Sequence, residues 1–330
     1  MSFFEEEKQI VPLITFNNGE YSFNEDTIQW LNSCKHHICP ICCAGRYRTG
    51  KSFLLNRLSE AQPNCGFGVG DSVQACTKGL WVYRHFFDGP NDSKIIYLDT
   101  EGIDALDAND THDVRIFTLA LLLSSTFLYN SVGAIDETAL QTLNLMTRVV
   151  QNIKVSSENS NKQDLAPHMP RFFWILRDFS LRLTDKSNQS ITCDEYLESA
   201  LQTTDKNKCH IREAIRTAFP RRKLVTLPRP TNDDNNTNRL ESIPGALTAK
   251  FKSALNALKN ELWTNITPMI ADGNCLNGLM YTELVKYFTN VIATNAVPVI
   301  HDSWALLSAV HARDLKDKLI SDMELFLTGD

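Results

Sequence analysis

The sequence predicts an α/β fold in which a mostly parallel sheet is covered by helices. Short apolar runs typical of strands alternate with segments of helical periodicity, and a glycine-rich turn joins one strand directly to a helix. Strands that alternate with helices favour a parallel sheet, because a crossover helix returns the chain to the starting edge. The chain has 330 residues, of which 43% are hydrophobic and 22% are charged, so it can bury a large core.

Composition argues against several classes of protein. A formal net charge of −6 disfavours nucleic acid as a partner. The acidic amino terminus, MSFFEEEKQIV, does not resemble a secretory signal peptide, and the apolar run at 116–129 is too short to span a bilayer. Nine cysteines without regular spacing predict reduced thiols. We therefore expect a cytoplasmic protein.

In the first half of the chain, β-rich runs flank a turn at 17–19, which predicts a hairpin. Asn24 can cap a short helix whose apolar residues share one face. We expect strands at 8–16, 21–23, 38–43, 80–86 and 94–98, and further helices at 51–58, 114–123 and 137–150.

In the second half, the polar segment 155–170 is broken by prolines and predicts a surface loop, and the polar segment 228–244 predicts another. After it only helical patterns follow, so the closing helices form an added layer or the start of a separate helical part. We expect strands at 171–176 and 223–227, and helices at 193–202, 211–219, 247–263, 276–293 and 304–326.

A cluster of cysteines and histidines precedes the glycine-rich turn and has two interpretations. Its Cys-x-x-Cys pair could ligate zinc together with the imidazoles. The segment HICPICCAG is also typical of a buried strand in which cysteine acts as a small apolar residue. No second pair follows at zinc-finger spacing, which favours burial. The cluster consists of Cys34, His36, His37, Cys39, Cys42 and Cys43.

Residues 45–52 (GRYRTGKS) match the phosphate-binding pattern GxxxxGK[ST], and they lie between an apolar strand and an apolar helix, as the pattern requires. In such a P-loop, successive backbone N–H groups and the helix N-terminus face the phosphates. Lys51 would reach the β and γ phosphates, and Ser52 would ligate a metal ion. We expect Mg²⁺ as the cofactor of this site.

Asp99 follows the apolar strand KIIYL and begins the sequence DTEG, which predicts an aspartate that holds the metal directly or through water. The N–H of Gly102 would then contact the γ-phosphate, and 102–113 would order with the triphosphate and relax after hydrolysis. Between the two motifs, the loop DSVQACTKG offers Thr77 as a second hydroxyl on Mg²⁺. A threonine and a glycine are also common in loops without any such role.

The residue that selects the base is less obvious, because no NKxD sequence occurs at a suitable position. Asp178 comes directly after the strand RFFWI, where its carboxylate could accept hydrogen bonds from guanine N1–H and the N2 amino group. Adenine lacks these donors and would leave a buried carboxylate unpaired. A bare Arg177-Asp178 pair is otherwise typical of a surface ion pair.

The ordered set GRYRTGKS, VQACTKG, LDTEG, LLSSTFLYNS and ILRDFS resembles the guanylate-binding proteins, which are large GTPases related to atlastins and dynamins. The resemblance covers about 16–299 and implies a P-loop NTPase G domain that binds GTP and GDP. It implies that Asp178 reads guanine and that Ser52, Thr77 and Asp99 hold the metal. The implied nucleotide contacts are Gly45, Tyr47, Arg48, Thr49, Gly50, Lys51, Ser52, Phe53, Gly102, Arg177 and Asp178.

The same resemblance implies an arginine finger in cis at Arg48, which would neutralise charge in the transition state. The family often has a serine two residues before the Mg²⁺ threonine to position the attacking water, but this chain has Ala75, followed by Cys76 where a histidine is common. Hydrolysis would then be slow, or Glu101 and an ordered water would take over. The expected catalytic residues are Arg48, Lys51, Thr77 and Glu101.

The resemblance also implies that 1–300 form one G domain and that 301–330 begin a C-terminal helical region. The loop 228–244 takes the position of the family's guanine cap, with Arg239 as a candidate contact across a dimer formed face to face. Family members continue into a helical stalk, and some carry a lipid attachment site. This chain ends without a CaaX sequence, so we expect peripheral membrane association through regions outside it.

We therefore expect a GTPase that uses Mg²⁺ to hydrolyse GTP to GDP, or further to GMP as some family members do, and that forms a homodimer through its nucleotide face. The alternative is a nucleotide-dependent assembly or membrane-remodelling switch with slow or no hydrolysis, suggested by Ala75. A P-loop kinase or transferase is disfavoured, because DTEG and the TKG loop are switch features and no acceptor site is visible.

Overall fold

The computed structural model describes most of the chain, and the expected α/β architecture is confirmed. The described residues are 9–17, 20–62, 65–68, 79–100, 111–141, 143, 153–155, 162–203, 205–232, 247–271, 273–294 and 296–328.

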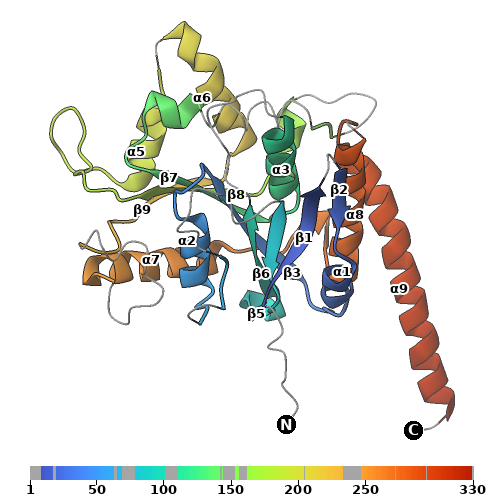
Figure 1. The fold of residues 1–330 in the computed structure, drawn as a ribbon. Coiled ribbons are helices and arrows are strands. Elements are labelled where there is room, and N and C mark those ends of the chain that lie inside the picture. The colour runs from blue at the N-terminus through green and yellow to red at the C-terminus, as the bar shows by residue number, and fades with distance from the viewer. Residues whose placement is uncertain are drawn as a thin grey trace.

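A mixed sheet forms the centre of the molecule (Figure 1). Its strand order is β2-β1-β4-β6-β3-β7-β8-β9, and β5 pairs with β6. Strands β6, β3, β7, β8 and β9 are parallel, whereas β1, β2, β4 and β5 pair antiparallel at one side. The strands are β1 (Ile10–Asn17), β2 (Glu20–Phe23), β3 (Ile38–Gly45), β4 (Leu80–Tyr83), β5 (Phe87–Asp88), β6 (Lys94–Thr100), β7 (Thr126–Val132), β8 (Arg171–Arg177) and β9 (Arg222–Thr226). A separate hairpin pairs β10 (Ile270–Ala271) with β11 (Asn274–Cys275).

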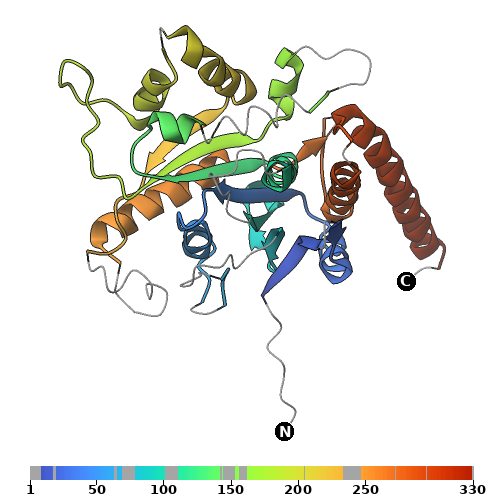
Figure 2. The same ribbon diagram turned by 45° about the horizontal axis from the view of Figure 1, so that its top comes forward.

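Helices cover both faces of the sheet, as the two views show (Figures 1 and 2). They are α1 (Glu25–Asn32), α2 (Lys51–Leu58), α3 (Thr111–Leu122), α5 (Cys193–Ala200), α6 (Lys206–Ala218), α7 (Ala249–Asn265), α8 (Gly278–Ala293) and α9 (Ile300–Thr328), with short 3-10 turns η1 (Pro90–Asp92) and η2 (Lys162–His168). Residues 137–141 are also helical. Helix α9 packs against α8 near its start, where Leu307 is buried, and then extends outward until Leu319 is 63% exposed.

Alternate residues of the central strands supply two separate cores, because successive side chains of a strand point to opposite faces. In β3, Cys39, Ile41 and Cys43 join the core beneath α2 and α7. Ile38 and Cys42 of the same strand join the larger core beneath α1, α3 and α8. Every residue of β3 is therefore buried, which explains its unbroken apolar sequence.

The cysteine cluster belongs to this buried structure. Cys34, Cys39, Cys42 and Cys43 are buried, and burial raises the pKa of the Cys39 thiol to about 11. Within the described residues, no group of three or more His, Cys, Asp or Glu side chains is arranged to hold a metal ion. The interpretation of HICPICCAG as a buried strand is confirmed.

Many of the expected elements have the predicted positions. Helix α2 has the predicted bounds, and Asn24 caps α1 by accepting a 2.9 Å hydrogen bond from the Thr27 backbone N–H. The polar loop predicted at 228–244 lies mostly outside the described residues, as does the later part of the helix predicted at 137–150.

Strand β7 is the main element that the sequence analysis missed. The apolar run 116–129 contains the end of α3, the turn Ser124-Ser125 and the start of β7, so only a short polar break separates helix from strand. The turn is fixed by the Ser125 backbone N–H, which donates to the Pro40 carbonyl at 3.0 Å. As a result, β7 enters the sheet between β3 and β8.

The prediction of a simple surface loop at 155–170 was wrong for the part that the structure describes. Residues 162–168 form η2, and Leu165 and Met169 are buried in the larger core. These two apolar side chains anchor the segment despite its prolines. Among the described residues, no helix is long and apolar enough to cross a bilayer.

The position of β7 generates a stability prediction. Phe127 has no exposed surface and lies between Phe117 of α3, with ring centroids 5.1 Å apart, and Phe172 of β8, at 6.4 Å. Replacing Phe127 by Ala should lower the free energy of unfolding, measured by urea denaturation, by about 3–5 kcal/mol because it leaves a cavity.

The matched control is Val132→Ala at the other end of β7, where the side chain is 52% exposed. Its effect should stay within about 0.5 kcal/mol. Equal effects of the two substitutions would contradict the central place of β7 in the core.

Candidate functional site

The P-loop joins the carboxyl end of β3 to α2, as expected. At its start, Gly45 pairs in register with Asn130 of β7 and has φ +154°. A Cβ atom on Gly45 would lie 2.1 Å from the Asn130 carbonyl oxygen. Only glycine fits this position, because any side chain would collide with the backbone of the neighbouring strand.

At the other end of the P-loop, Gly50 has φ +78° and precedes the first residue of α2. Its carbonyl oxygen accepts two hydrogen bonds: one at 3.0 Å from the Leu54 backbone N–H and one at 3.0 Å from Nη1 of Arg177. The left-handed conformation of Gly50 thus turns the chain into α2 and directs its carbonyl toward the end of β8.

Arg177 lies beneath the P-loop and is only 4% exposed. Its guanidinium carbon lies 5.5 Å from the ring centroid of Phe53 and 5.9 Å from that of Phe251. Burial lowers the pKa of Arg177, and the charge of Asp178 opposes this effect. The side chain of Arg177 therefore supports the P-loop backbone, and the buried side chain of Phe53 packs below it.

Asn130 is a site residue that the sequence analysis did not identify. Its Nδ2 donates a 2.8 Å hydrogen bond to the Thr49 carbonyl, so β7 holds the middle of the P-loop. Asn130 has no exposed surface, and its Oδ1 has no hydrogen-bond partner within the described residues. The available sequence signal was an amide within the apolar run FLYN, at the carboxyl end of an unrecognised strand.

Lys51, Ser52 and Asp99 meet at the carboxyl edge of the sheet. The Ser52 hydroxyl donates a 2.6 Å hydrogen bond to Oδ2 of Asp99, and the Lys51 ammonium donates to the Arg46 carbonyl at 3.3 Å. Asp99 pairs in register with Cys43 and is fully buried. Burial raises the pKa of Asp99 to about 6, and the charge of Lys51 and the Ser52 hydrogen bond oppose that rise.

This group of oxygens fits a magnesium ion. Oδ1 of Asp99 is buried and lacks a hydrogen-bond partner within the described residues, while Oδ2 already contacts Ser52. A buried carboxylate oxygen without a partner is costly, and hard cations such as Mg²⁺ prefer oxygen ligands. The donor set is therefore chemically suited to the metal that the motif predicts.

The tip of the P-loop is open to solvent. Arg48 is exposed, has φ +60°, and its guanidinium carbon lies 5.6 Å from the ring centroid of Tyr47. Thr49 Oγ1 donates to the Arg46 carbonyl at 2.8 Å, which tightens the turn. Arg48 is thus held at the surface of the loop, in contrast to the buried Lys51.

Asp178 follows β8 directly and is exposed, with φ +55°. It lines a broad cavity of about 1090 Å³ together with Phe179, Thr226, Arg229 and Lys250. The adjacent backbone is fixed because the Phe179 N–H donates to the Leu227 carbonyl at 3.1 Å. The end of β8 therefore carries two functional side chains: Arg177, which supports the P-loop, and Asp178, whose carboxylate faces a neighbouring cavity.

Several predicted residues lie outside the described part of the chain. They are Thr77, Glu101 and Gly102, together with Ala75, Cys76 and Arg239. Their expected roles stay predictions.

The burial of Asp99 generates a pH prediction for the protein in EDTA without nucleotide. The pKa of Asp99 is about 6 in the folded chain, against an ordinary value of 3.8. As pH rises between these values, the unfolded chain loses this proton first, so the folded state loses stability relative to it. The penalty is complete above pH 6.

Asp99→Asn removes this titration while keeping an oxygen for Ser52. The free energy of unfolding of the variant minus that of the unchanged protein should therefore be about 2 kcal/mol larger at pH 8 than at pH 4.5. Denaturant titrations at the two pH values measure this difference. A difference independent of pH would contradict an elevated pKa at Asp99.

Comparisons with known proteins agree with these motifs. A family model for the N-terminal domain of guanylate-binding proteins matches residues 18–268. Guanylate-binding protein 6 of Mus musculus is 33% identical over 310 residues, which cover 90% of this chain and 50% of that protein. The Homo sapiens guanylate-binding protein 6 is 33% identical over 312 residues, covering 90% and 49%.

Guanylate-binding protein 1 of Chlorocebus aethiops is 30% identical over 325 residues, covering 94% of this chain and 55% of that protein. The chain thus spans about half the length of the curated relatives it matches. The match of the family model covers most of the chain and includes the P-loop, Asp99 and Asp178. The chain belongs to the guanylate-binding protein family.

Proposed function

We propose that this chain is a magnesium-dependent G domain that binds GTP and hydrolyses it to GDP. The observation that carries the proposal is the meeting of the P-loop, the Ser52–Asp99 pair and Asp178 at one edge of the sheet. Membership of the guanylate-binding protein family supports the same activity.

The phosphate end of the site is the P-loop. Its backbone N–H groups and the N-terminus of α2 would face the phosphates, because both carry partial positive charge. Lys51 is 6% exposed and holds its ammonium near the Arg46 carbonyl, so a triphosphate would replace a weak partner by a charged one. This exchange supports Lys51 as the principal phosphate cation.

Ser52 and Asp99 would hold Mg²⁺, with Thr77 as the predicted further ligand. The metal, when bound, would supply positive charge that offsets the negative charge of the phosphates. Asp99 accepts the Ser52 hydrogen bond in the described state, so metal binding would require the serine proton to turn away from Oδ2. The unpartnered Oδ1 of Asp99 is available for a metal or a bound water.

Asp178 would select the base. A carboxylate accepts hydrogen bonds from the N1–H and N2 amino groups of guanine, which adenine does not have. The exposure of Asp178 and the adjacent cavity of about 1090 Å³ leave room for a base beside β8. The resulting selection is electrostatic, because adenine would leave a carboxylate without donors.

Arg48 would act in the transition state. It is exposed at the tip of the P-loop, from which its long side chain can turn toward phosphates on either side. In a homodimer formed through the nucleotide face, the loop would be shielded from water, and the guanidinium charge would then act at low dielectric. Lys51, Thr77 and Glu101 complete the proposed catalytic set.

The second candidate function is a nucleotide-dependent assembly switch with slow or no hydrolysis. It is favoured by Ala75, which lacks the hydroxyl that would orient an attacking water. Chromatography of the products separates the two candidates and also detects GMP. A GTP-loaded dimer that persists for hours without product would support the switch.

Cytoplasmic location and peripheral membrane association stay predictions of the sequence.

The base assignment predicts an exchange of specificity. Asp178→Asn should weaken binding of a fluorescent GDP analogue roughly 100-fold, because charged hydrogen bonds to the base are lost. The variant should gain affinity for the corresponding xanthine nucleotide, whose C2 carbonyl accepts from the asparagine amide.

The unchanged protein serves as control and should bind and turn over GTP in strong preference to ATP. Comparable use of ATP and GTP would contradict the assignment of Asp178 as the residue that selects guanine. Unaltered GDP affinity in Asp178→Asn would show that another group reads the base.

Arg48→Ala should lower kcat for GTP by about 1000-fold while KM changes only a few fold, because the arginine acts mainly on the transition state. Arg46→Ala is the matched control, since Arg46 is an exposed neighbour that contributes its backbone carbonyl to the loop. Steady-state GTP turnover measures both. If Arg48→Ala lowered kcat and GTP affinity equally, Arg48 would contribute to GTP binding and not specifically to the transition state.

A further inference from the structure

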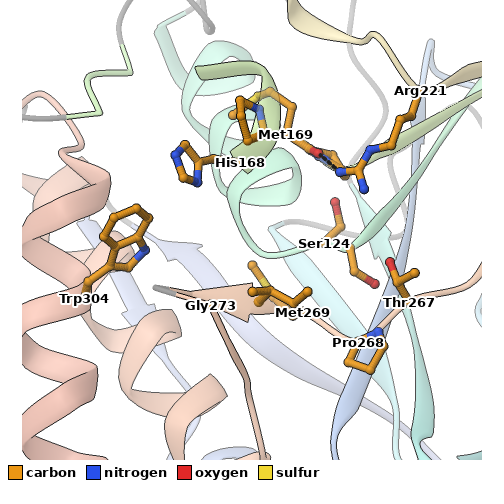
Figure 3. A pocket seen from close by; sticks show the side chains of 13 residues that line it. Ser124, His168, Met169, Arg221, Thr267, Pro268, Met269, Gly273 and Trp304 are labelled. Atoms are coloured by element: carbon orange, nitrogen blue, oxygen red, sulfur yellow. Dashed lines mark hydrogen bonds between the residues drawn. The ribbon is translucent and has the colours of Figure 1, made fainter. Parts of the chain in front are cut away.

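A second cavity, of about 300 Å³, lies at the opposite edge of the sheet from the P-loop. It forms where the amino ends of β7 and β8 meet the β10–β11 hairpin and the first turns of α9 (Figure 3). Since β8 has seven residues, the length of one strand, about 20 Å, separates this edge from the P-loop edge. The cavity is therefore distinct from the proposed nucleotide site.

One end of the cavity is cationic. The Arg221 guanidinium points into it near Ser124, and its Nη2 donates a 3.0 Å hydrogen bond to the Met169 carbonyl (Figure 3). Within the described residues, Arg221 has no carboxylate partner. Partial burial lowers the pKa of Arg221, and the neighbouring charge of Arg171 lowers it further. The guanidinium groups of Arg221 and Arg171 thus create positive potential at this end of the cavity, and no carboxylate within the described residues pairs with them.

Arg171 does not neutralise or occupy this end. Its Nη1 donates to Oδ1 of Asn265 at 3.1 Å, and its Nε is buried without a partner within the described residues. Arg171 is therefore held in place as a source of charge. Arg221 retains further N–H donors beyond the one used by the Met169 carbonyl, because a guanidinium carries five.

The other end of the cavity is mainly aromatic and apolar. Trp304 of α9 forms one wall, and Met169 and Met269 contribute flexible apolar surface (Figure 3). The Trp304 ring is held by His168, with ring centroids 5.0 Å apart, and by His301, at 4.2 Å. An aromatic wall held in place by two imidazole rings suits a planar ligand, and thioethers adapt well to rings.

We propose that this cavity binds a small carboxylate with a flat apolar body. The carboxylate lies against the free N–H groups of Arg221, whose planar fork matches the two oxygens. The ring lies between Trp304 and the methionines. A cavity of about 300 Å³ accommodates one ring with its carboxylate and little more, which limits the ligand class to small molecules.

Such a ligand would join two parts of the chain. Arg221 and Met169 adjoin the sheet, whereas Trp304 belongs to α9. A molecule that contacts both stabilises the arrangement in which α9 lies against the domain, because binding favours the state that offers all contacts. The site would thereby link a small metabolite to the position of the C-terminal helix.

The test uses benzoate as the probe and its neutral isostere benzamide as the comparison, each titrated against the whole chain by saturation-transfer NMR. Benzoate should bind at least about tenfold more tightly than benzamide, because only the carboxylate forms charge-assisted hydrogen bonds with Arg221. Arg221→Gln should remove this preference. Arg313→Gln, which removes one exposed positive charge from α9, is the charge-matched control and should preserve it.

A separate variant tests the apolar wall. Trp304→Leu should weaken benzoate and benzamide alike, by about fivefold, since it removes the ring contact and leaves the charge. Equal affinities of the unchanged protein for benzoate and benzamide would overturn the proposal, as would an undiminished preference in Arg221→Gln. The comparison of the two probes on the unchanged protein does not depend on any variant's folding.

The proposal is independent of the nucleotide assignment. Arg221→Gln should bind a fluorescent GDP analogue as the unchanged protein does, because the two sites lie at opposite edges of the sheet. Failure of GTP binding in the unchanged protein would leave the benzoate result intact. If the unchanged protein bound GDP normally but did not bind benzoate, only the proposal of this second site would be overturned.

Discussion

The conformation of the P-loop depends on a buried guanidinium at the end of β8. Arg177 donates to the Gly50 carbonyl at 3.0 Å and is enclosed by the rings of Phe53 and Phe251. Its Nε has no hydrogen-bond partner within the described residues, so its burial carries a desolvation cost. The contacts with the two aromatic rings and the hydrogen bond to the Gly50 carbonyl offset that cost. The left-handed turn at Gly50 directs this carbonyl toward the guanidinium.

The same constraint connects the two ends of the proposed nucleotide site. Arg177 and Asp178 are adjacent, so the strand end that fixes the phosphate loop also fixes the carboxylate proposed to read the base. Asn130 adds a second support from β7, through the Thr49 carbonyl. Two neighbouring parallel strands therefore position the loop from beneath, while Lys51 and Asp99 stay buried at the carboxyl ends of the strands.

Local sequence signals predicted much of this fold, and long-range contacts limited the rest. The glycine pattern located α2 because Gly45 and Gly50 require conformations or close approaches that other residues do not tolerate. Strand β7 was missed because α3 and β7 share one apolar run. The direction of the Arg177 side chain was also beyond the sequence, because its partner, Gly50, is 127 residues away. The cavity beside Trp304 likewise combines distant segments of the chain, so local sequence patterns did not predict it. The roles of Thr77 and Glu101 stay predictions.

The most direct test of the Arg177 support is hydrogen exchange in Arg177→Met, combined with binding of a fluorescent GDP analogue. Methionine fits between two rings, so global stability should change little, as often follows when a buried charge is replaced by an apolar side chain. We predict faster amide exchange within 46–52 and at least about tenfold weaker GDP binding, since the Gly50 carbonyl loses a charged donor. Unchanged exchange and unchanged affinity would contradict the account.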